Sequence, residues 1–373
     1  MRATGRFIAV AAAAVLAACG SATTTPSSPA PTASAHGAAT PTPTPIASAA
    51  AASTPGSSAS SAAPSAAPPA GRIAVVVGDT NTPSLVITVP GASAAERIVA
   101  GAGSVTWSPD GHRLLFSCEA RPDSLPGLCS ADLGDATGAR VPVLDEVAWA
   151  RWSPTAELVA LGRSFVDVGD TWLAHPDGTG LRQLGITGYE MVADRWSPDG
   201  TRLAGRASFG GVNSFEVAVC EVAAPSCRTV GPGQAQAWSP DGRLAVVNGD
   251  SRPPSLVDPV TGARVGLTEL GLGTVLLDWS ATGSIAAVGA DLAVVVLSPG
   301  IATPHPIAPG LRVPEALTRS VAWSPGGAWI GLLASSSGDE RTDLYVVRAD
   351  GTDLTRVTTT GDARDFAWAP EAP

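Results

Sequence analysis

The pentapeptide WSPDG occurs three times in this sequence, at Trp107–Gly111, Trp196–Gly200 and Trp238–Gly242. Proline presets φ for the first central position of a tight turn, and aspartate suits the position that follows. Glycine then accepts the left-handed conformation that closes a bulged hairpin. Short apolar runs such as "RLLFS" and "RLAVVNG" follow the motif. WSPDG therefore predicts a turn that joins two β-strands.

The tryptophan that opens this motif recurs along the C-terminal three quarters of the chain. Degenerate copies read "WSPTA", "WSATG", "WSPGG" and "WAPEA". The intervals between successive copies are 45, 44, 42, 41, 44 and 45 residues. Such regular spacing is the signature of a repeat architecture. The repeated tryptophans are Trp107, Trp152, Trp196, Trp238, Trp279, Trp323 and Trp368.

Each repeat contains four short apolar runs. The third is seen in "DLYVVRA", and a second turn with a fourth run is seen in "AHPDGTGLRQLGI" at Ala174–Ile186. Four strands in a period of roughly 43 residues predict a blade of a β-propeller. The repeated tryptophan ends the first, innermost strand, so we expect its large ring to fill the gap between neighbouring blades.

The two ends of the repeat region are incomplete in complementary ways. Gly71–Gly101 supplies second, third and fourth strands without a tryptophan-bearing first strand, whereas the chain finishes on "DFAWAPEAP", a first strand and half a turn. Joining Phe366–Pro370 to Arg72–Ala100 completes one blade and leaves no unpaired sheet edge. The prediction is an all-β, seven-bladed β-propeller, or a six-bladed one if the degenerate repeat at Trp279 does not form.

The sequence pattern "WSPDG…DGTxLxxLT" resembles the TolB-type, WD40-like (PD40) propeller repeats, and the resemblance covers residues 71–373. Proteins of this type include periplasmic assembly factors, propeller domains attached to serine peptidases, and lipoproteins. The resemblance implies the fold and no particular function. TolB proteins carry a globular N-terminal domain that this sequence lacks, which counts against a TolB-specific role.

Residues 1–18 are predicted to be a signal peptide, with Arg2 and Arg6 before an apolar run at Phe7–Leu16 that is too short to span a bilayer. The sequence Leu-Ala-Ala-Cys that ends at Cys19 resembles the lipobox of bacterial lipoproteins, which implies a diacylated cysteine. A plain secretory signal is the alternative. We expect the protein on the extracytoplasmic side of the cell membrane, anchored through the lipid on Cys19.

Residues 19–70 are almost wholly Ala, Ser, Thr and Pro. Such a segment has too little large apolar surface to fold, so a disordered tether is expected. The formal charge of −10 becomes −12 when the two arginines of the signal peptide are lost. An acidic surface argues against nucleic acid as a partner. We expect a monomer.

Four cysteines follow Cys19, in two pairs that are each local in sequence. An even number in an exported protein predicts two disulfides, Cys118 to Cys129 and Cys220 to Cys227, although three connectivities exist. A zinc site is the alternative, but the paired CxxC spacing is missing.

Catalytic motifs are lacking in the sequence. His36, His112, His175 and His305 show no metal-binding or catalytic spacing. No catalytic residue, cofactor or metal is therefore predicted. Three charged residues directly precede motif tryptophans and are expected to line the central channel: Arg151, Arg195 and Asp278.

Loops that join second to third strands, and fourth strands to the next blade, should gather on one face of a propeller. Exposed aromatic and arginine residues are favoured at interfaces. The predicted function is a protein- or peptide-binding or scaffold module; the alternative is an enzyme or a carbohydrate-binding protein with its site at the channel mouth. The candidate binding residues on the face are Arg121, Asp123, Phe165, Asp167, Tyr189, Phe209, Asn213, Arg252 and Arg341.

Overall fold

The fold is described from a computed structural model of the chain. The described residues are 71–78, 83–91, 96–100, 102–118, 127–133, 141–163, 170–209, 215–224, 226–248, 252–271, 273–300, 303–314, 319–336 and 341–371. The predicted signal peptide, Cys19 and the predicted tether lie outside these residues.

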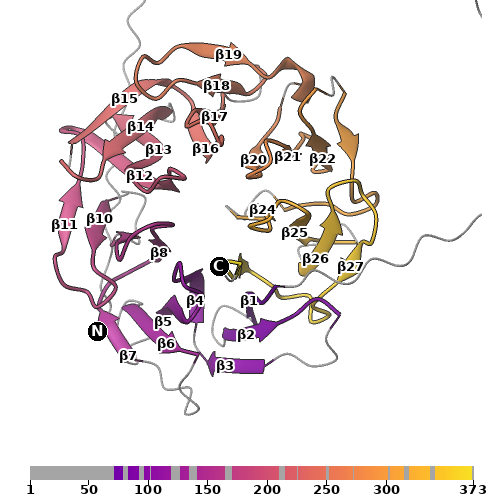
Figure 1. Cartoon of the computed structure of the whole chain (residues 1–373), viewed down its shortest axis with the longest axis horizontal. Coiled ribbons are helices and arrows are strands. Elements are labelled where there is room, and N and C mark those ends of the chain that lie inside the picture. The colour runs from indigo at the N-terminus through magenta and orange to yellow at the C-terminus, as the bar shows by residue number, and fades with distance from the viewer. Residues whose placement is uncertain are drawn as a thin grey trace, which may run out of the picture. The chain divides into compact units, whose positions relative to one another are not determined.

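Seven four-stranded antiparallel sheets surround a common centre as the blades of a propeller (Figure 1). Each blade is named here after the motif tryptophan on its innermost strand. The Trp107 blade contains β4 (Ala102–Trp107), β5 (Arg113–Cys118), β6 (Gly127–Asp132) and β7 (Val141–Leu144). The Trp152 blade contains β8 (Trp149–Trp152), β9 (Val159–Gly162), β10 (Thr171–Ala174) and β11 (Arg182–Leu184). The Trp196 blade contains β12 (Tyr189–Trp196), β13 (Arg202–Phe209), β14 (Phe215–Glu221) and β15 (Ser226–Pro232).

The next three blades repeat the same order. The Trp238 blade contains β16 (Gln234–Trp238), β17 (Leu244–Val247), β18 (Ser255–Val257) and β19 (Arg264–Gly266), followed by the 3-10 helix η1 (Thr268–Leu270). The Trp279 blade contains β20 (Leu276–Trp279), β21 (Ile285–Val288), β22 (Val294–Leu297) and β23 (His305–Pro306). The Trp323 blade contains β24 (Val321–Trp323), β25 (Trp329–Ala334), β26 (Asp343–Arg348) and β27 (Thr355–Arg356).

The Trp368 blade is built from both ends of the propeller sequence. Its strand order is β28 (Asp365–Trp368), β1 (Ile73–Val77), β2 (Ser84–Thr88) and β3 (Glu96–Ala100). The antiparallel pairing of β28 with β1 closes the ring, as predicted. The seven-bladed prediction is confirmed, and the six-bladed alternative is wrong because the degenerate Trp279 repeat forms a complete blade.

The WSPDG turns have the local geometry that their residues favour. In the first copy, the N–H of Gly111 donates to the carbonyl of Ser108 at 2.9 Å, and Gly111 has φ of +70°. The hydroxyl of Ser108 also contacts the Asp110 carboxylate at 2.5 Å, which holds the turn from inside. The positive φ explains why glycine closes this turn, since other residues adopt that conformation at a steric cost.

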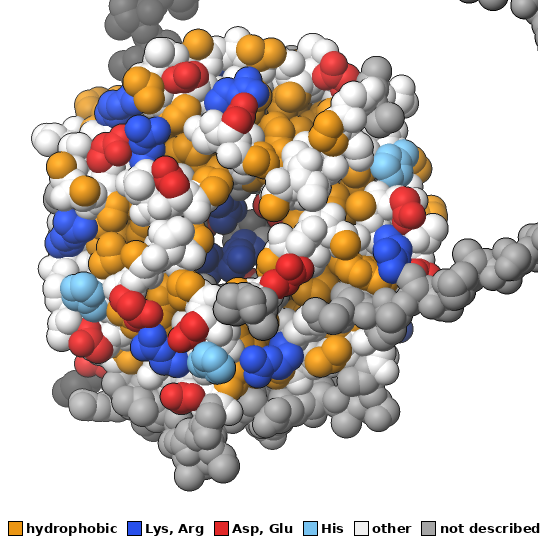
Figure 2. All heavy atoms as spheres, viewed as in Figure 1, with side chains coloured by type: hydrophobic (Ala, Val, Ile, Leu, Met, Phe, Trp, Pro, Cys, Tyr) orange, Lys and Arg blue, Asp and Glu red, His pale blue; other side chains and the backbone are white. Residues whose placement is uncertain are grey.

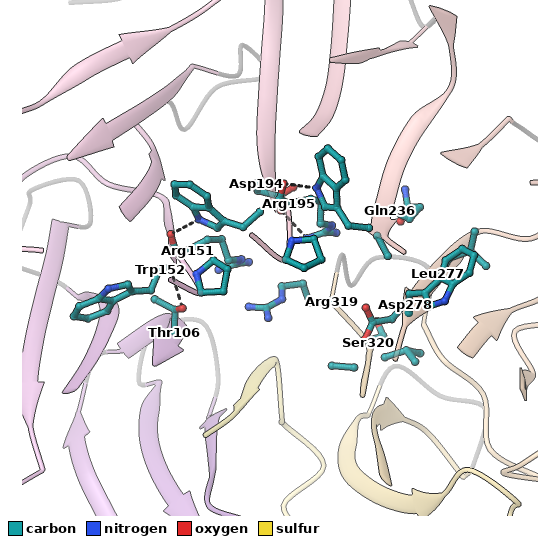
Figure 3. Close-up of a pocket in the computed structure, with 18 residues that line it drawn as sticks. Thr106, Arg151, Trp152, Asp194, Arg195, Gln236, Leu277, Asp278, Arg319 and Ser320 are labelled. Atoms are coloured by element: carbon teal, nitrogen blue, oxygen red, sulfur yellow. Dashed lines mark hydrogen bonds and ion pairs between the residues drawn. The ribbon is translucent and has the colours of Figure 1, made fainter. Parts of the chain in front are cut away.

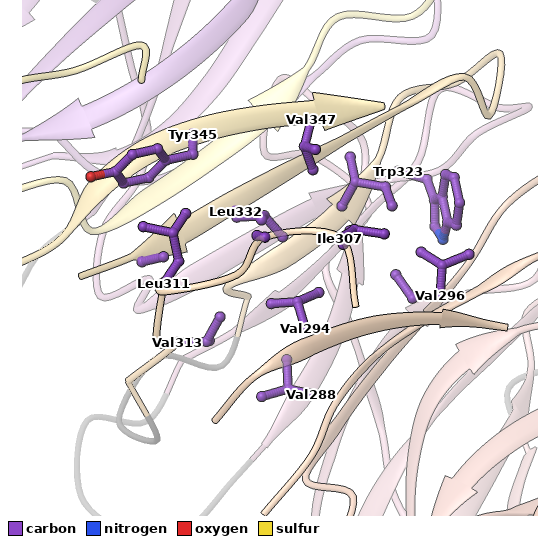
Figure 4. Packing of buried hydrophobic residues seen from close by; sticks show 14 residues of the cluster. Val288, Val294, Val296, Ile307, Leu311, Val313, Trp323, Leu332, Tyr345 and Val347 are labelled. Carbon is purple, nitrogen blue, oxygen red and sulfur yellow. The ribbon is translucent and has the colours of Figure 1, made fainter. Parts of the chain in front are cut away.

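The apolar core is divided among the seams between blades. Each of the seven buried clusters combines residues from two neighbouring blades, so every seam of the ring has its own core. Figure 4 shows the cluster between the Trp279 and Trp323 blades, where Val296 and Trp323 lie among aliphatic side chains. Each motif tryptophan lies in one of these clusters or packs against one.

Five of the motif indoles also tie neighbouring blades together through a hydrogen bond. In each case Nε1 donates to the carbonyl of the residue just before the motif tryptophan of the preceding blade. The bonds are Trp107 to Ala367 at 3.0 Å, Trp196 to Arg151 at 3.0 Å, Trp238 to Arg195 at 2.9 Å, Trp323 to Asp278 at 3.3 Å and Trp368 to Ala322 at 3.2 Å. The Nε1 atoms of Trp152 and Trp279 are buried without a partner among the described residues.

Both predicted disulfides are present. Cys118 and Cys129 join β5 to β6, and Cys220 and Cys227 join β14 to β15, where they are directly paired across the ladder. The four cysteines are therefore not zinc ligands.

Candidate functional site

A cavity of about 380 Å³ lies among the innermost strands, in the middle of the ring. Figure 2 shows it as a central hollow with basic side chains on its wall, which are arginines because the sequence contains no lysine. Six of the seven blades contribute to its lining. The polar and charged lining residues are Thr106, Arg151, Asp194, Arg195, Gln236, Asp278, Arg319 and Ser320.

On two of the innermost strands, the residue before the motif tryptophan accepts a hydrogen bond from the next blade. The hydroxyl of Thr106 accepts a hydrogen bond from the backbone N–H of Trp152, at 3.2 Å. The Oδ2 atom of Asp278 accepts one from the N–H of Trp323, at 2.8 Å. Thr106 and Asp278 thus bond to the next blade, whereas Arg151 and Arg195 at the same position bond to their own chain neighbours and line the cavity. As predicted for the channel lining, Arg151, Arg195 and Asp278 all border the cavity.

Arg151 is held in the wall of the cavity. Its Nη1 donates to the carbonyl of Ala150 at 2.7 Å, whereas its buried Nε has no partner among the described residues. Burial lowers the pKa of Arg151 to about 9, with a smaller contribution from the like charge of Arg319. The carboxylates of Asp365 and Asp194 act on the pKa of Arg151 in the opposite direction.

Arg195 differs from Arg151 in having a carboxylate partner. Its Nη1 lies 2.9 Å from the Oδ2 of Asp194, the adjacent residue in β12. Its Nε is nevertheless buried without a partner within the described part of the chain. One ion pair therefore leaves part of the donor capacity of this guanidinium free.

Arg319 is a channel residue that sequence reasoning missed. It precedes β24, four positions before Trp323, and its Nη1 is buried without a hydrogen-bond partner in the described structure. The equivalent position of the last repeat is also an arginine, Arg364, four positions before Trp368, so an arginine at this spacing was the signal available in the sequence.

Asp278 is the buried acid of the channel. Burial raises its pKa, while the backbone N–H groups of Trp323 and Trp279 act in the opposite direction by hydrogen bonding to the carboxylate. Its oxygens are thus already engaged with backbone donors. The cavity wall as a whole contains three arginines and two aspartates, a formal excess of one positive charge in a chain whose net charge is −10.

No protein-family model and no curated protein matches this chain. Solved structures do resemble it. TolB from Acinetobacter baumannii has a TM-score of 0.55 at 17% identity, over 81% of this chain and 67% of that chain. The chain has a TolB-like β-propeller fold.

Two further solved structures with a similar fold come from a protease and a hydrolase. The β-propeller domain of the Trilobed protease from Pyrococcus furiosus has a TM-score of 0.55 at 11% identity, over 77% of this chain and 92% of that chain. That domain has an open velcro topology, whereas the TolB-like propeller described here closes through β28 and β1. Puromycin hydrolase has a TM-score of 0.51 at 20% identity, and the match takes in 79% of this chain and 53% of that chain.

The predicted binding face is only partly within the described residues. Arg121, Asp123, Phe165, Asp167 and Asn213 lie outside them. Tyr189 and Phe209 are directly paired at the ends of β12 and β13, with ring centroids 5.3 Å apart. Arg252 is exposed between β17 and β18 of the Trp238 blade, which adjoins the Trp196 blade. Arg341 is exposed before β26 of the more distant Trp323 blade. Of the four candidate residues that the structure describes, only the two aromatic ones are in contact with each other.

The aromatic pair rests on a glycine. Gly188 has φ of +81°, and a Cβ placed there would lie 3.1 Å from Cε2 of Phe209. The phenyl ring therefore packs closely over the backbone of the connection that leads into β12, while Phe209 stays 60% exposed. An exposed ring held in place by its neighbours loses little conformational freedom when a partner covers it.

The three described histidines lie away from the cavity lining. The His175 ring contacts the carbonyl of Glu157, and the His305 ring contacts that of Ala349, so both serve the packing of turns. The described residues contain no group of three His, Cys, Asp or Glu side chains that would hold a metal ion. No helix among them is long and apolar enough to cross a membrane.

Proposed function

We propose that this TolB-like propeller is a lipid-anchored, extracytoplasmic binding module that holds a protein or peptide on the face carrying Tyr189 and Phe209. The observation that carries the proposal is the exposure of Phe209, which is 60% accessible although its ring is fixed against Tyr189. Ordered, exposed aromatic side chains are the residues most often found at the energetic centre of protein interfaces.

The topology of the blades supports this choice of face. Strands in each blade run antiparallel in sequence order, so connections from second to third strands and from fourth strands to the next blade lie on one side. Phe209 ends a second strand and Tyr189 begins a first strand, which places both on that side. Arg252 and Arg341 belong to the same side and would form its charged periphery.

The test places a photo-crosslinking phenylalanine analogue at position 209 of the anchored protein on intact cells. Position 260 is the matched control: Val260 is 59% exposed in the turn between β18 and β19, which lies on the opposite face. We expect a discrete crosslinked protein or peptide from position 209 only. Equal yields of the same product from both positions, or none from position 209, would refute the binding face.

The anchor is tested separately. We expect Cys19→Ala to release the protein from the membrane fraction, since the proposed diacyl group supplies the membrane affinity. A variant that stays with the membranes would contradict lipidation at Cys19 and leave the binding face untouched.

The alternative function, an enzyme or carbohydrate-binding protein that works at the channel, has one observation in its favour. The cavity gathers ionisable side chains from the Trp152, Trp196, Trp279 and Trp323 blades. Three of these side chains are arginines, which favour an anionic ligand.

A further inference from the structure

We propose that the channel cavity is a binding site for a small organic oxyanion, a carboxylate or a phosphate ester, held by Arg151, Arg195 and Arg319. The inference does not depend on the partner of the loop face, because the cavity and the Tyr189–Phe209 pair share no residue.

The first support is the set of donors that the described protein leaves unused. Arg151 Nε, Arg195 Nε and Arg319 Nη1 are all buried, and none has a hydrogen-bond partner among the described residues. Buried polar atoms in proteins are nearly always paired, and a buried charged donor without a partner is unfavourable. The guanidinium groups that carry these atoms come from three blades and line one cavity. An oxyanion in the cavity would therefore meet three guanidinium groups whose hydrogen-bond donors are not all used by the described protein.

The second support is the balance of charge. Asp194 is already paired with Arg195, and Asp278 accepts backbone hydrogen bonds from Trp323 and Trp279. Among the described residues, neither Arg151 nor Arg319 has a carboxylate at ion-pair distance. The like charge of Arg319 contributes to the lowered pKa of Arg151, and the carboxylates of Asp365 and Asp194 act in the opposite direction. An anion between them would relieve this repulsion, whereas a neutral ligand would not.

The third support is geometry. Figure 3 shows the guanidinium groups of Arg151, Arg195 and Arg319 pointing into the same space, the first two from inner strands and the third from the segment just before β24. Guanidinium groups present planar forks of N–H donors that match carboxylate and phosphate oxygens. The site is therefore complementary to an oxyanion in both charge and shape.

The size of the cavity indicates more than an inorganic ion. Its volume of about 380 Å³ lies within the range of roughly 300–1,000 Å³ typical of small-molecule sites. Apolar side chains of Pro154, Pro198 and Leu277 form part of the wall, and Gln236 and Ser320 add neutral polar groups. These residues would contact the body of a small organic molecule whose anionic group lies among the arginines.

The test measures thermal unfolding and calorimetric binding of the full chain in sodium phosphate, sodium succinate and sodium chloride at equal ionic strength. For the wild type we expect a saturable rise of the unfolding temperature with phosphate or succinate and none with chloride. A response to phosphate alone or succinate alone distinguishes a phosphate from a carboxylate as the anionic group.

Two variants and one control make the test specific. Arg319→Gln removes a guanidinium whose Nη1 has no hydrogen-bond partner among the described residues, so the variant should fold and should weaken anion binding at least ten-fold. Arg151→Gln should act in the same direction. Arg243→Gln is the control, because Arg243 pairs with Asp241 on an exposed turn away from the cavity; it should bind the anion as the wild type does.

The results that overturn the proposal are equally definite. One is the absence of saturable binding of either anion by the wild type. The other is wild-type affinity in both Arg319→Gln and Arg151→Gln. Either result contradicts the site. Crosslinking from position 209 reports on the loop face alone, so failure of one proposal is distinguishable from failure of the other.

Discussion

Ile73 and Trp368 lie directly opposite each other on adjacent antiparallel strands, although they come from the two ends of the described chain. The same pairing sets Val75 against Phe366, whose ring is 1% exposed in the core of the last seam. Closure of the ring therefore depends on one short strand that buries an aromatic side chain and supplies the inner edge of its blade.

Deletion of residues 366–373 should lower the unfolding temperature by at least about 10 °C, since it removes the closing strand and leaves β1 with an open edge. Scanning calorimetry measures this change. Deletion of Ala372 and Pro373 alone, which lie beyond β28, is the control and should have little effect. An unchanged transition after the longer deletion would contradict the role of β28.

Phe366→Ala should cost about 3–5 kcal/mol of unfolding free energy, the usual range for a large-to-small change at a buried phenylalanine. Phe209→Ala is the matched control, because its ring is 60% exposed and should leave stability nearly unchanged. Urea denaturation of both variants makes the comparison, and equal losses would mean that the last seam is not packed as described.

Trp238→Phe and Trp279→Phe should differ in stability. Both replacements remove the same part of a ring from an inner strand, but Trp238 Nε1 donates to the Arg195 carbonyl at 2.9 Å, whereas Trp279 Nε1 is buried without a partner among the described residues. Loss of the bonded donor should cost about 1–2 kcal/mol more than loss of the unbonded one. A larger loss at position 279, measured by chemical denaturation, would contradict this hydrogen-bond pattern.

As pH falls, Asp199 and Asp278 should change the stability of the fold in opposite directions. Hydrogen bonds from Ser197 and the Thr201 N–H lower the pKa of Asp199, so its ionised form stabilises the fold above about pH 4 and that stabilisation is lost as pH falls further. The stability advantage of the wild type over Asp199→Asn should therefore shrink below pH 4.

Asp278 should affect the pH dependence of stability in the opposite direction. Because burial raises its pKa above the ordinary value of 3.8, the folded state takes up a proton before the unfolded state does. The wild type should therefore gain stability relative to Asp278→Asn as pH falls through the raised pKa. Denaturation curves between pH 7 and pH 3 measure both aspartates in one series, and parallel behaviour of the two variants would contradict the assignments.

The fold could be predicted from the sequence because a tryptophan ends the innermost strand of every blade. The spacing of the motif tryptophans predicted the seven blades, and the missing first strand before Ile73 predicted the closing partner near Trp368. Arg151, Arg195 and Asp278 were also recognisable, because they hold the position just before a motif tryptophan.

Other features depend on distances in the folded ring, which the spacing of the repeats along the sequence does not determine. Arg319 and Arg364 hold the same position relative to a motif tryptophan, yet Arg319 lines the cavity with Arg151 and Arg364 is not part of that lining. The contact of Tyr189 with Phe209 depends on β12 and β13 being eight residues long each, whereas the innermost strands β16 and β20 of the two following blades have five and four. Strand length is set by tertiary pairing and was not readable from the turn motifs.

The closing pair also sets an order of events for the newly made chain. Residues 73–77 emerge from the ribosome first among the strands, yet their inner neighbour, residues 365–368, emerges last. Six blades can assemble from continuous segments of the chain, but these two strands meet only after residues 365–368 have been made. The circular form of the propeller is thus completed as a late, single step, and a prematurely terminated chain ends as an open arc.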